Sequence, residues 1–190
     1  VSHQGAERFL HALWAQGTTS AVVFPTVHKV SAEALFEQAA AARMRLIIIG
    51  AVHIAAPLLT IARSCGYACS LIDPRSAFGT DQRFPGETVL DDWPDAAVQG
   101  LRPDGRTAVV TLTHDPKLDD PAILATLQTH AFYIGCLGSS RTHASRLDRL
   151  RALGVDKDSL ARVHGPVGLK IGAQTAAEIA ISIMAEITAT

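Results

Sequence analysis

The stretch that decides the fold is Arg45–Leu59, which reads RLIIIGAVHIAAPLL. A short run of Leu and Ile that ends in glycine is typical of a strand buried on both faces of a parallel sheet. The next segment, Ile54–Cys65, has apolar residues at helical spacing and stops at Gly66, and a second β-rich run, Ala68–Ile72, closes on Asp73. This order of elements predicts the first unit of a dinucleotide-binding fold: a strand, a glycine turn, a helix, a second strand and an acidic residue.

The glycine loop matches the fingerprint of such folds only in part. Its three positions, G-x-G-x-x-G/A, are Gly50, Val52 and Ala55. Gly50 permits a tight turn and Ala55 permits close packing of helix on strand, but Val52 puts a branched side chain where the backbone would approach a pyrophosphate. Asp73 lies 23 residues after Gly50, near the ~20 expected of a ribose-binding acid. The loop therefore predicts the fold and leaves open whether a dinucleotide binds.

Strands and helices are expected to alternate along the rest of the chain. The expected strands are Thr107–Thr113 and Ala131–Cys136, and the expected helices are Trp93–Leu101, Asp120–His130, Arg141–Leu153 and a last helix opened by a capping box at Thr175–Glu178. This alternation predicts an α/β fold: a Rossmann-like, doubly wound, mostly parallel sheet with helices on both faces, spanning residues 45–190. Residues 1–44 are expected to form an N-terminal appendage of helix, short strand and helix.

Composition excludes several classes of protein. The formal net charge is −1 and no basic cluster occurs among the 190 residues, which argues against nucleic-acid binding. No apolar run reaches the ~18 residues of a membrane-spanning helix, and we expect no signal peptide. Three cysteines in no zinc or disulfide spacing favour a reducing compartment. The expected location is the cytoplasm.

Candidate functional residues gather at the carboxyl ends of the expected strands, where ligands bind in open α/β sheets. Three interpretations are open for His53 and His114. They are hydrogen-bonded structural residues, a proton donor–acceptor pair, or two metal ligands with Asp115 or Asp73 as a third. No zinc-spaced set of ligands occurs, so no metal ligand is assigned. The catalytic candidates are His114 and Asp115. The candidates for cofactor binding are Gly50, Val52, His53, Asp73, Arg75, Thr113, His114, Gly138, Ser139 and Arg141.

Three local features each admit two interpretations. Arg75 either meets a phosphate or pairs with Asp73. The second strand–glycine–helix junction, Gly135–Arg141, either holds an anion on its backbone N–H groups or is a glycine turn followed by a serine cap. The polar residues spaced by four on the last helix (Glu178, Ser182 and Glu186) either face a site or form the solvated side.

An ordered set of motifs resembles the XdhC/CoxI family of molybdenum-hydroxylase accessory proteins, in their C-terminal Rossmann domain. The matching stretches are Ile49–Ala55, Asp73–Arg75, Phe78, Arg83–Pro85, Thr113–Asp115, Tyr133–Ser139, Pro166–Ala173 and Glu178–Ile187. Two positions depart from the family pattern, because Val52 replaces a glycine and Ala176 replaces a proline.

The resemblance implies a protein that helps to mature enzymes of the xanthine dehydrogenase or carbon monoxide dehydrogenase type. It would bind the molybdenum cofactor or a related phosphorylated ligand in the Rossmann crevice. It would be non-catalytic or weakly catalytic, would form a homodimer, and would work with the apoenzyme and a sulfurtransferase. A second interpretation is an NAD(P)-dependent oxidoreductase with Asp73 on the ribose and His114 as acid or base. A third is a non-enzymatic dimerising domain of a maturation complex.

Overall fold

The computed structural model describes residues 8, 43–75, 77–78 and 82–190. The well-described unit runs from Met44 to Thr190. The helix, short strand and helix expected over residues 1–44 lie outside the described residues, apart from Arg8, which is helical, and Arg43 and Met44, which are not. These expectations and the domain boundary therefore stay predictions. Within the described part of the chain, no helix combines the length and apolar character needed to cross a bilayer.

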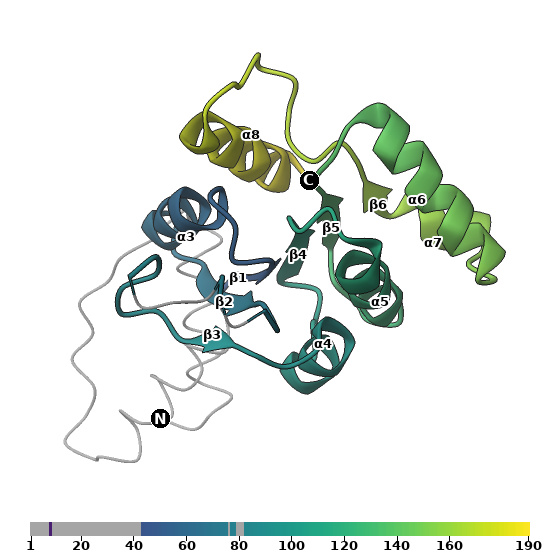
Figure 1. Ribbon diagram of the computed structural model, residues 1–190, viewed down its shortest axis with the longest axis horizontal. Coiled ribbons are helices and arrows are strands. Elements are labelled where there is room, and N and C mark those ends of the chain that lie inside the picture. The colour runs from purple at the N-terminus through teal and green to yellow at the C-terminus, as the bar shows by residue number, and fades with distance from the viewer. Residues whose placement is uncertain (1–7, 9–42, 76, 79–81) are drawn as a thin grey trace. The chain divides into compact units, whose positions relative to one another are not determined.

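The described residues form a six-stranded sheet in the order β3-β2-β1-β4-β5-β6 (Figure 1). All neighbouring strands pair in parallel. The strands are β1 (Arg45–Ile49), β2 (Ala68–Ile72), β3 (Val89–Leu90), β4 (Thr107–Thr111), β5 (Tyr133–Cys136) and β6 (Val163–His164). β1 is central, with Arg45 opposite Ala68 on one side and Thr107 on the other. The strand order reverses between β1 and β4, so a ligand crevice is expected beyond their carboxyl ends.

Helices cover both faces of this sheet (Figure 1). They are α3 (Ala55–Ser64), α4 (Pro94–Leu101), α5 (Pro116–Leu127), α6 (Ser140–Ala152), α7 (Lys157–Ala161) and α8 (Ala176–Ala189). Successive residues of β1 point to opposite faces. Leu46 and Ile48 belong to the core under α3 and α8, whereas Ile47 and Ile49 belong to the core under α4 and α5. A third cluster joins β5 and β6 to α5, α6 and α7. The prediction of a doubly wound parallel α/β fold is confirmed.

The start of α5 differs from the sequence-based expectation. Two Asp-Pro pairs compete for this helix start, and the expectation placed the cap at Asp120. In the structure Asp115 is the N-cap, its Oδ1 accepts from the Lys117 N–H at 2.9 Å, and Pro116 occupies the first turn. Pro121 consequently lies inside the helix. The short elements β3, α7 and β6 had no counterpart in the expectations, because runs of two to five residues carry no readable periodicity.

Glu186 connects the last helix, α8, to the sheet. Its carboxylate accepts a hydrogen bond from the Tyr133 hydroxyl at 2.6 Å and another from the Gly168 N–H, and it lies 3.4 Å from Nδ1 of His164. Ser182 on the same stripe is also buried. The interpretation of this stripe as a solvated side is therefore wrong for Ser182 and Glu186, whereas Glu178 completes the predicted capping box with Thr175.

Candidate functional site

The first crevice loop follows β1 and is shaped by a glycine. Gly50 has a φ of +110°, a backbone conformation that residues with a side chain rarely adopt. A Cβ at this position would meet Cγ2 of Thr113 at 2.7 Å, so the loops after β1 and β4 touch here without room for a methyl group. Val52 is half-buried beside this turn, and His53 is exposed at the start of α3.

The carboxylate of Asp73, at the end of β2, is buried and fully engaged. Oδ2 accepts from the Ala51 N–H at 2.8 Å and from Nη2 of Arg75 at 2.7 Å. Oδ1 accepts from the backbone N–H and Nε of Arg75 at 3.0 and 2.8 Å. Burial acts to raise the pKa of Asp73, but the bonds from Arg75 and Ala51 outweigh it and hold that pKa below its usual value. These four bonds use the acceptor positions of a carboxylate.

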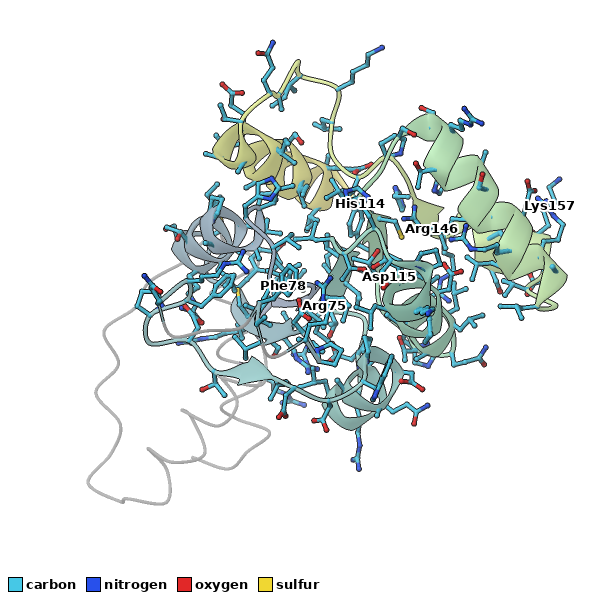
Figure 2. The ribbon with its side chains drawn as sticks, viewed as in Figure 1. Arg75, Phe78, His114, Asp115, Arg146 and Lys157 are labelled. Atoms are coloured by element: carbon cyan, nitrogen blue, oxygen red, sulfur yellow. The ribbon has the colours of Figure 1, made fainter. Side chains whose placement is uncertain are left out.

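Arg75 therefore pairs with Asp73. Of its two interpretations, a phosphate contact or an ion pair with Asp73, this conformation shows the ion pair. Its guanidinium also lies over the ring of Phe78, with Cζ 4.0 Å from the ring centroid (Figure 2). Asp73 and Arg75 together hold the first loop through the Ala51 N–H. Their position at the crevice is as predicted, but their visible role is to support the loop.

The second crevice loop, after β4, contains the two catalytic candidates. The Asp115 N–H donates to the Thr113 hydroxyl oxygen at 3.0 Å, which closes a tight turn around His114. His114 has a φ of +61° and is exposed; this left-handed conformation is uncommon for a residue other than glycine and occurs often at functional sites. The Asp115 carboxylate caps α5. The loop thus presents the His114 imidazole to solvent beside a partly buried carboxylate (Figure 2).

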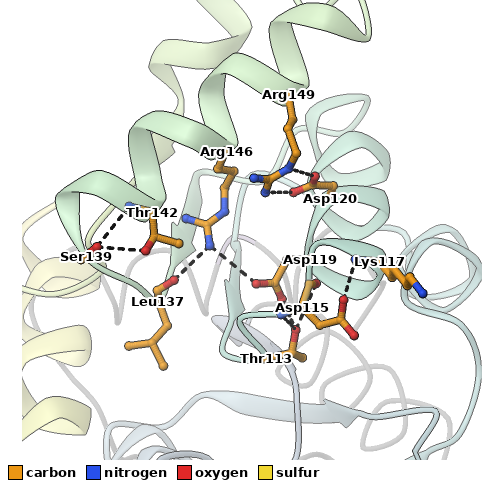
Figure 3. Close-up of polar contacts among 10 residues, drawn as sticks. All are labelled: Thr113, Asp115, Lys117, Asp119, Asp120, Leu137, Ser139, Thr142, Arg146 and Arg149. Carbon is orange, nitrogen blue, oxygen red and sulfur yellow. Dashed lines mark hydrogen bonds and ion pairs between the residues drawn. The ribbon is translucent and has the colours of Figure 1, made fainter.

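Behind this loop lies a buried ion pair that the sequence did not reveal. The Thr113 hydroxyl donates to Oδ1 of Asp119 at 2.6 Å, and Oδ2 of Asp119 is 3.6 Å from Nη2 of Arg146 (Figure 3). Nη2 of Arg146 also donates to the Leu137 carbonyl at 3.0 Å. Both side chains are 2% exposed. Burial raises the pKa of Asp119, against the opposing effects of Thr113 and Arg146.

The third crevice loop joins β5 to α6. Gly138 has a φ of +145°, and Ser139 caps α6 by accepting from the Thr142 N–H at 3.1 Å. The predicted serine cap is therefore present. Among the described residues, none accepts a hydrogen bond from the backbone N–H groups of residues 138–141, and the exposed Arg141 side chain has no partner. A capped helix start with free amides remains suited to an anion.

The topology brings the predicted residues to one edge of the sheet, at the carboxyl ends of β1, β2, β4 and β5. In the described part of the chain, no three His, Cys, Asp or Glu side chains are placed to hold a metal ion. The metal-ligand interpretation of His53 and His114 thus gains no support there. A depression of about 390 Å³ between the carboxyl ends of α4 and α5 lies at the opposite edge of the sheet and contains none of the candidates.

Sequence reasoning missed Asp119 and Arg146 as residues of this site. Asp119 precedes the expected helix start, and Arg146 is one of several arginines on a polar helix. The sequence contains a weak indication for Asp119, because Asp115 and Asp119 are one helical turn apart after a Pro-marked start. For Arg146 it contains none, since an arginine is rarely buried and nothing distinguishes it from Arg149 or Arg151.

A family model and several known proteins resemble this chain. A family model described as the XdhC Rossmann domain matches residues 46–187. The chain is 35% identical over 99 residues to the molybdenum cofactor insertion chaperone PaoD of Escherichia coli (strain K12), a match that covers 52% of this chain and 30% of that protein. It is 32% identical over 157 residues to a probable xanthine dehydrogenase subunit of Bacillus subtilis (strain 168), a match that covers 82% of this chain and 46% of that protein.

A solved structure also resembles this chain. A crystal structure of a xanthine dehydrogenase from Bacillus halodurans matches with a TM-score of 0.64 and 31% identity, over 77% of this chain and 42% of that chain. The chain therefore spans less than half the length of each of these three relatives.

Proposed function

The chain belongs to the XdhC family, whose Rossmann domain matches it from residue 46 to residue 187, and from this premise we propose that it acts in the maturation of a molybdenum hydroxylase. In this proposal the crevice beyond β1, β4 and β5 binds the molybdenum cofactor through its phosphate. The names of two relatives, a molybdenum cofactor insertion chaperone and a probable xanthine dehydrogenase subunit, support this role. The proposed partners are the apoenzyme and a sulfurtransferase, and a homodimer remains a prediction.

The observation that carries this proposal is the set of free donors at the start of α6. The N–H groups of residues 138–141 have no acceptor among the described residues, and the Arg141 side chain is exposed beside them. A helix N-terminus with an arginine is suited to a phosphate monoester. The residues present therefore fit the phosphate of a phosphorylated pterin. When bound, the cofactor supplies a molybdenum centre for the client enzyme, and this chain's residues hold it and shield it.

Two features argue against the NAD(P)-dependent oxidoreductase. The Asp73 carboxylate makes four hydrogen bonds within the protein, so a ribose would have to displace one of them. Val52 also occupies the position at which a glycine admits the pyrophosphate. If Val52 is the steric obstacle, Val52→Gly should gain NAD(H) binding measured by calorimetry. No gain in the variant would remove the steric argument.

The decisive experiment is mass spectrometry of the small molecules released when the purified protein is denatured. The protein is produced in a host that makes the molybdenum cofactor, with a host that lacks the cofactor as the control. We expect a molybdopterin species in the first preparation alone. Release of NAD or NADP would favour the oxidoreductase. If the protein releases neither a molybdopterin nor a dinucleotide, and its molecular mass in solution rises with protein concentration, the interpretation as a dimerising domain would be favoured.

The phosphate position has its own test. We expect Arg141→Ala to weaken binding of the molybdenum cofactor about tenfold, the equivalent of about 1.5 kcal/mol for one charge-assisted hydrogen bond. The matched control is Arg151→Ala, on the last turn of the same helix, where the arginine pairs with Asp148. That variant removes the same charge far from the free amides and should bind normally. Equal loss in both variants, or in neither, would contradict the assignment of Arg141.

A further inference from the structure

Two of the crevice loops, those after β1 and β4, meet at the side chain of Thr113. Its methyl group Cγ2 packs so closely on Gly50 that a Cβ there would lie 2.7 Å away, which fixes the loop after β1 against the loop after β4. Its hydroxyl oxygen accepts from the Asp115 N–H at 3.0 Å and so holds the turn that presents His114. The hydroxyl can play this part because its own proton is directed to Oδ1 of Asp119, 2.6 Å away.

The loop after β5 is connected to the same network through Arg146. The guanidinium of Arg146 projects from α6 toward α5 (Figure 3), where it pairs with Asp119 at 3.6 Å and donates to the Leu137 carbonyl at 3.0 Å. Leu137 directly precedes Gly138, the start of the loop with the free amides. A continuous path of contacts thus runs from Gly50 through Thr113, Asp119 and Arg146 to the loop after β5.

We propose that Asp119 and Arg146 are positioning residues of the cofactor crevice: Asp119 orients the Thr113 hydroxyl, and Arg146 couples this contact to the loop after β5. Neither residue touches the ligand. Both act through backbone that does, namely the turn of His114 and the amides that begin α6. This inference rests on the proposed function for its ligand, but its structural part concerns the loops alone.

A purely stabilising role explains the ion pair poorly. Oδ2 of Asp119 and the Nε and Nη1 atoms of Arg146 are buried and have no hydrogen-bond partner among the described residues. Buried ion pairs contribute little net stability unless their remaining polar atoms are satisfied. The neighbouring pair provides the contrast. Arg149 donates to both oxygens of Asp120 at 2.6 and 3.0 Å and so also joins α5 to α6, and among the described residues neither side chain forms a hydrogen bond or ion pair with a crevice loop. Two ion pairs thus link the same helices, and the poorly satisfied one supports the loops.

The test compares two double variants of the full chain. Asp119→Leu/Arg146→Met replaces the positioning pair by apolar side chains, which buried pairs often tolerate. Asp120→Leu/Arg149→Met does the same to the neighbouring pair and is the matched control. One readout is the His114 imidazole signal in the ¹H–¹³C NMR spectrum, identified by its disappearance in His114→Gln. The other is the affinity for molybdenum cofactor extracted from a purified molybdoenzyme.

We expect Asp119→Leu/Arg146→Met to unfold cooperatively, to shift or broaden the His114 signal without ligand, and to bind the cofactor about tenfold more weakly. Asp120→Leu/Arg149→Met should change neither readout. Asp119→Asn retains an acceptor for the Thr113 hydroxyl and should restore the wild-type His114 signal. If the first double variant fails to fold, Thr113→Val tests the part of the proposal that concerns Asp119, because it removes the hydroxyl that Asp119 orients and keeps a methyl group against Gly50.

The two readouts separate this inference from the proposed function. If wild-type protein fails to bind the cofactor while the His114 signal responds as expected, the proposed ligand is wrong and the positioning role stands. If wild-type protein binds but the His114 signal is the same in both double variants, the positioning role is overturned and the proposed function stands. Equal weakening of binding in the two double variants would also overturn the positioning role, since it would show a general effect of uncoupling α5 from α6.

Discussion

Substitution of Gly50 by alanine tests how rigidly the crevice loops are held together. Gly50 has a φ of +110°, and an added Cβ would lie 2.7 Å from Cγ2 of Thr113 and 3.3 Å from its backbone nitrogen. Two energetic costs therefore add in Gly50→Ala. The first is the strain of the backbone conformation. The second is the steric clash with the Thr113 side chain, which its hydrogen bonds with Asp119 and Asp115 keep in place.

The glycine at position 66 allows these two costs to be separated. Gly66 has a φ of +84°, and a Cβ there would meet nothing within 4 Å. Gly66→Ala should therefore cost only the backbone term, about 1–2 kcal/mol. Gly50→Ala should cost that amount and about 1–3 kcal/mol more for overpacking. The expected difference in the free energy of unfolding between the two variants is about 2 kcal/mol.

Urea unfolding measures this difference directly. With a slope of about 2 kcal/mol per molar urea, typical of small proteins, Gly50→Ala should unfold at about 1 M less urea than Gly66→Ala. Cofactor binding should fall in Gly50→Ala alone, because only that substitution displaces Thr113. Equal midpoints for the two variants would refute the reasoning, since they would mean that Thr113 moves aside at no cost.

Two further predictions concern the hydrogen bonds that support the site. Because the pKa of Asp73 is held below its usual value, its pairing with Arg75 stabilises the fold fully above about pH 4, and this stabilisation is lost as the pH falls through the lower folded-state pKa. The Tm difference between wild type and Asp73→Asn should thus be constant from about pH 7 to about pH 5 and shrink below about pH 4; a difference that grows in acid would contradict this. Tyr133→Phe removes the donor to Glu186 and should cost about 1–2 kcal/mol in urea unfolding. Tyr67→Phe is the control, because the Tyr67 hydroxyl makes no hydrogen bond to any described residue. Equal losses in the two variants would contradict the role of the Tyr133–Glu186 bond.

The fold could be predicted because its determinants are local in the sequence. The run Leu46–Ile49 with Gly50 and Asp73 defines one strand–helix–strand unit, and the alternation that follows allows few topologies. The resemblance to the XdhC family, based on ordered motifs, was confirmed by the family match. The predicted start of α5 was wrong, because Asp115-Pro116 and Asp120-Pro121 are equally typical of a helix start. Only the turn at Thr113 selects the first of them.

The placement of the candidate residues at one edge of the sheet could be predicted, but the contacts of their side chains could not. Parallel strands place their carboxyl ends at one edge, so His53, His114 and Arg141 could be assigned to the crevice without coordinates. What each side chain contacts depends on tertiary neighbours. Sequence alone left open whether Arg75 would pair with Asp73, and it gave no reason to expect the burial of Arg146. Both outcomes follow from which carboxylate each guanidinium meets after the helices pack.

In the part of the chain that the structure describes, the sheet ends on both sides in strands too short to pair with an added strand. β3 and β6 have two residues each, so a segment of another chain would find at most one or two backbone partners on either of them. Long, open margins are where chains add to one another by strand extension, and short ones suppress that route. Under the proposed function, a partner that takes the cofactor from this chain would therefore have to recognise side chains and loops. Such contacts would suit the transfer of a labile cofactor, because they separate more readily than a shared sheet.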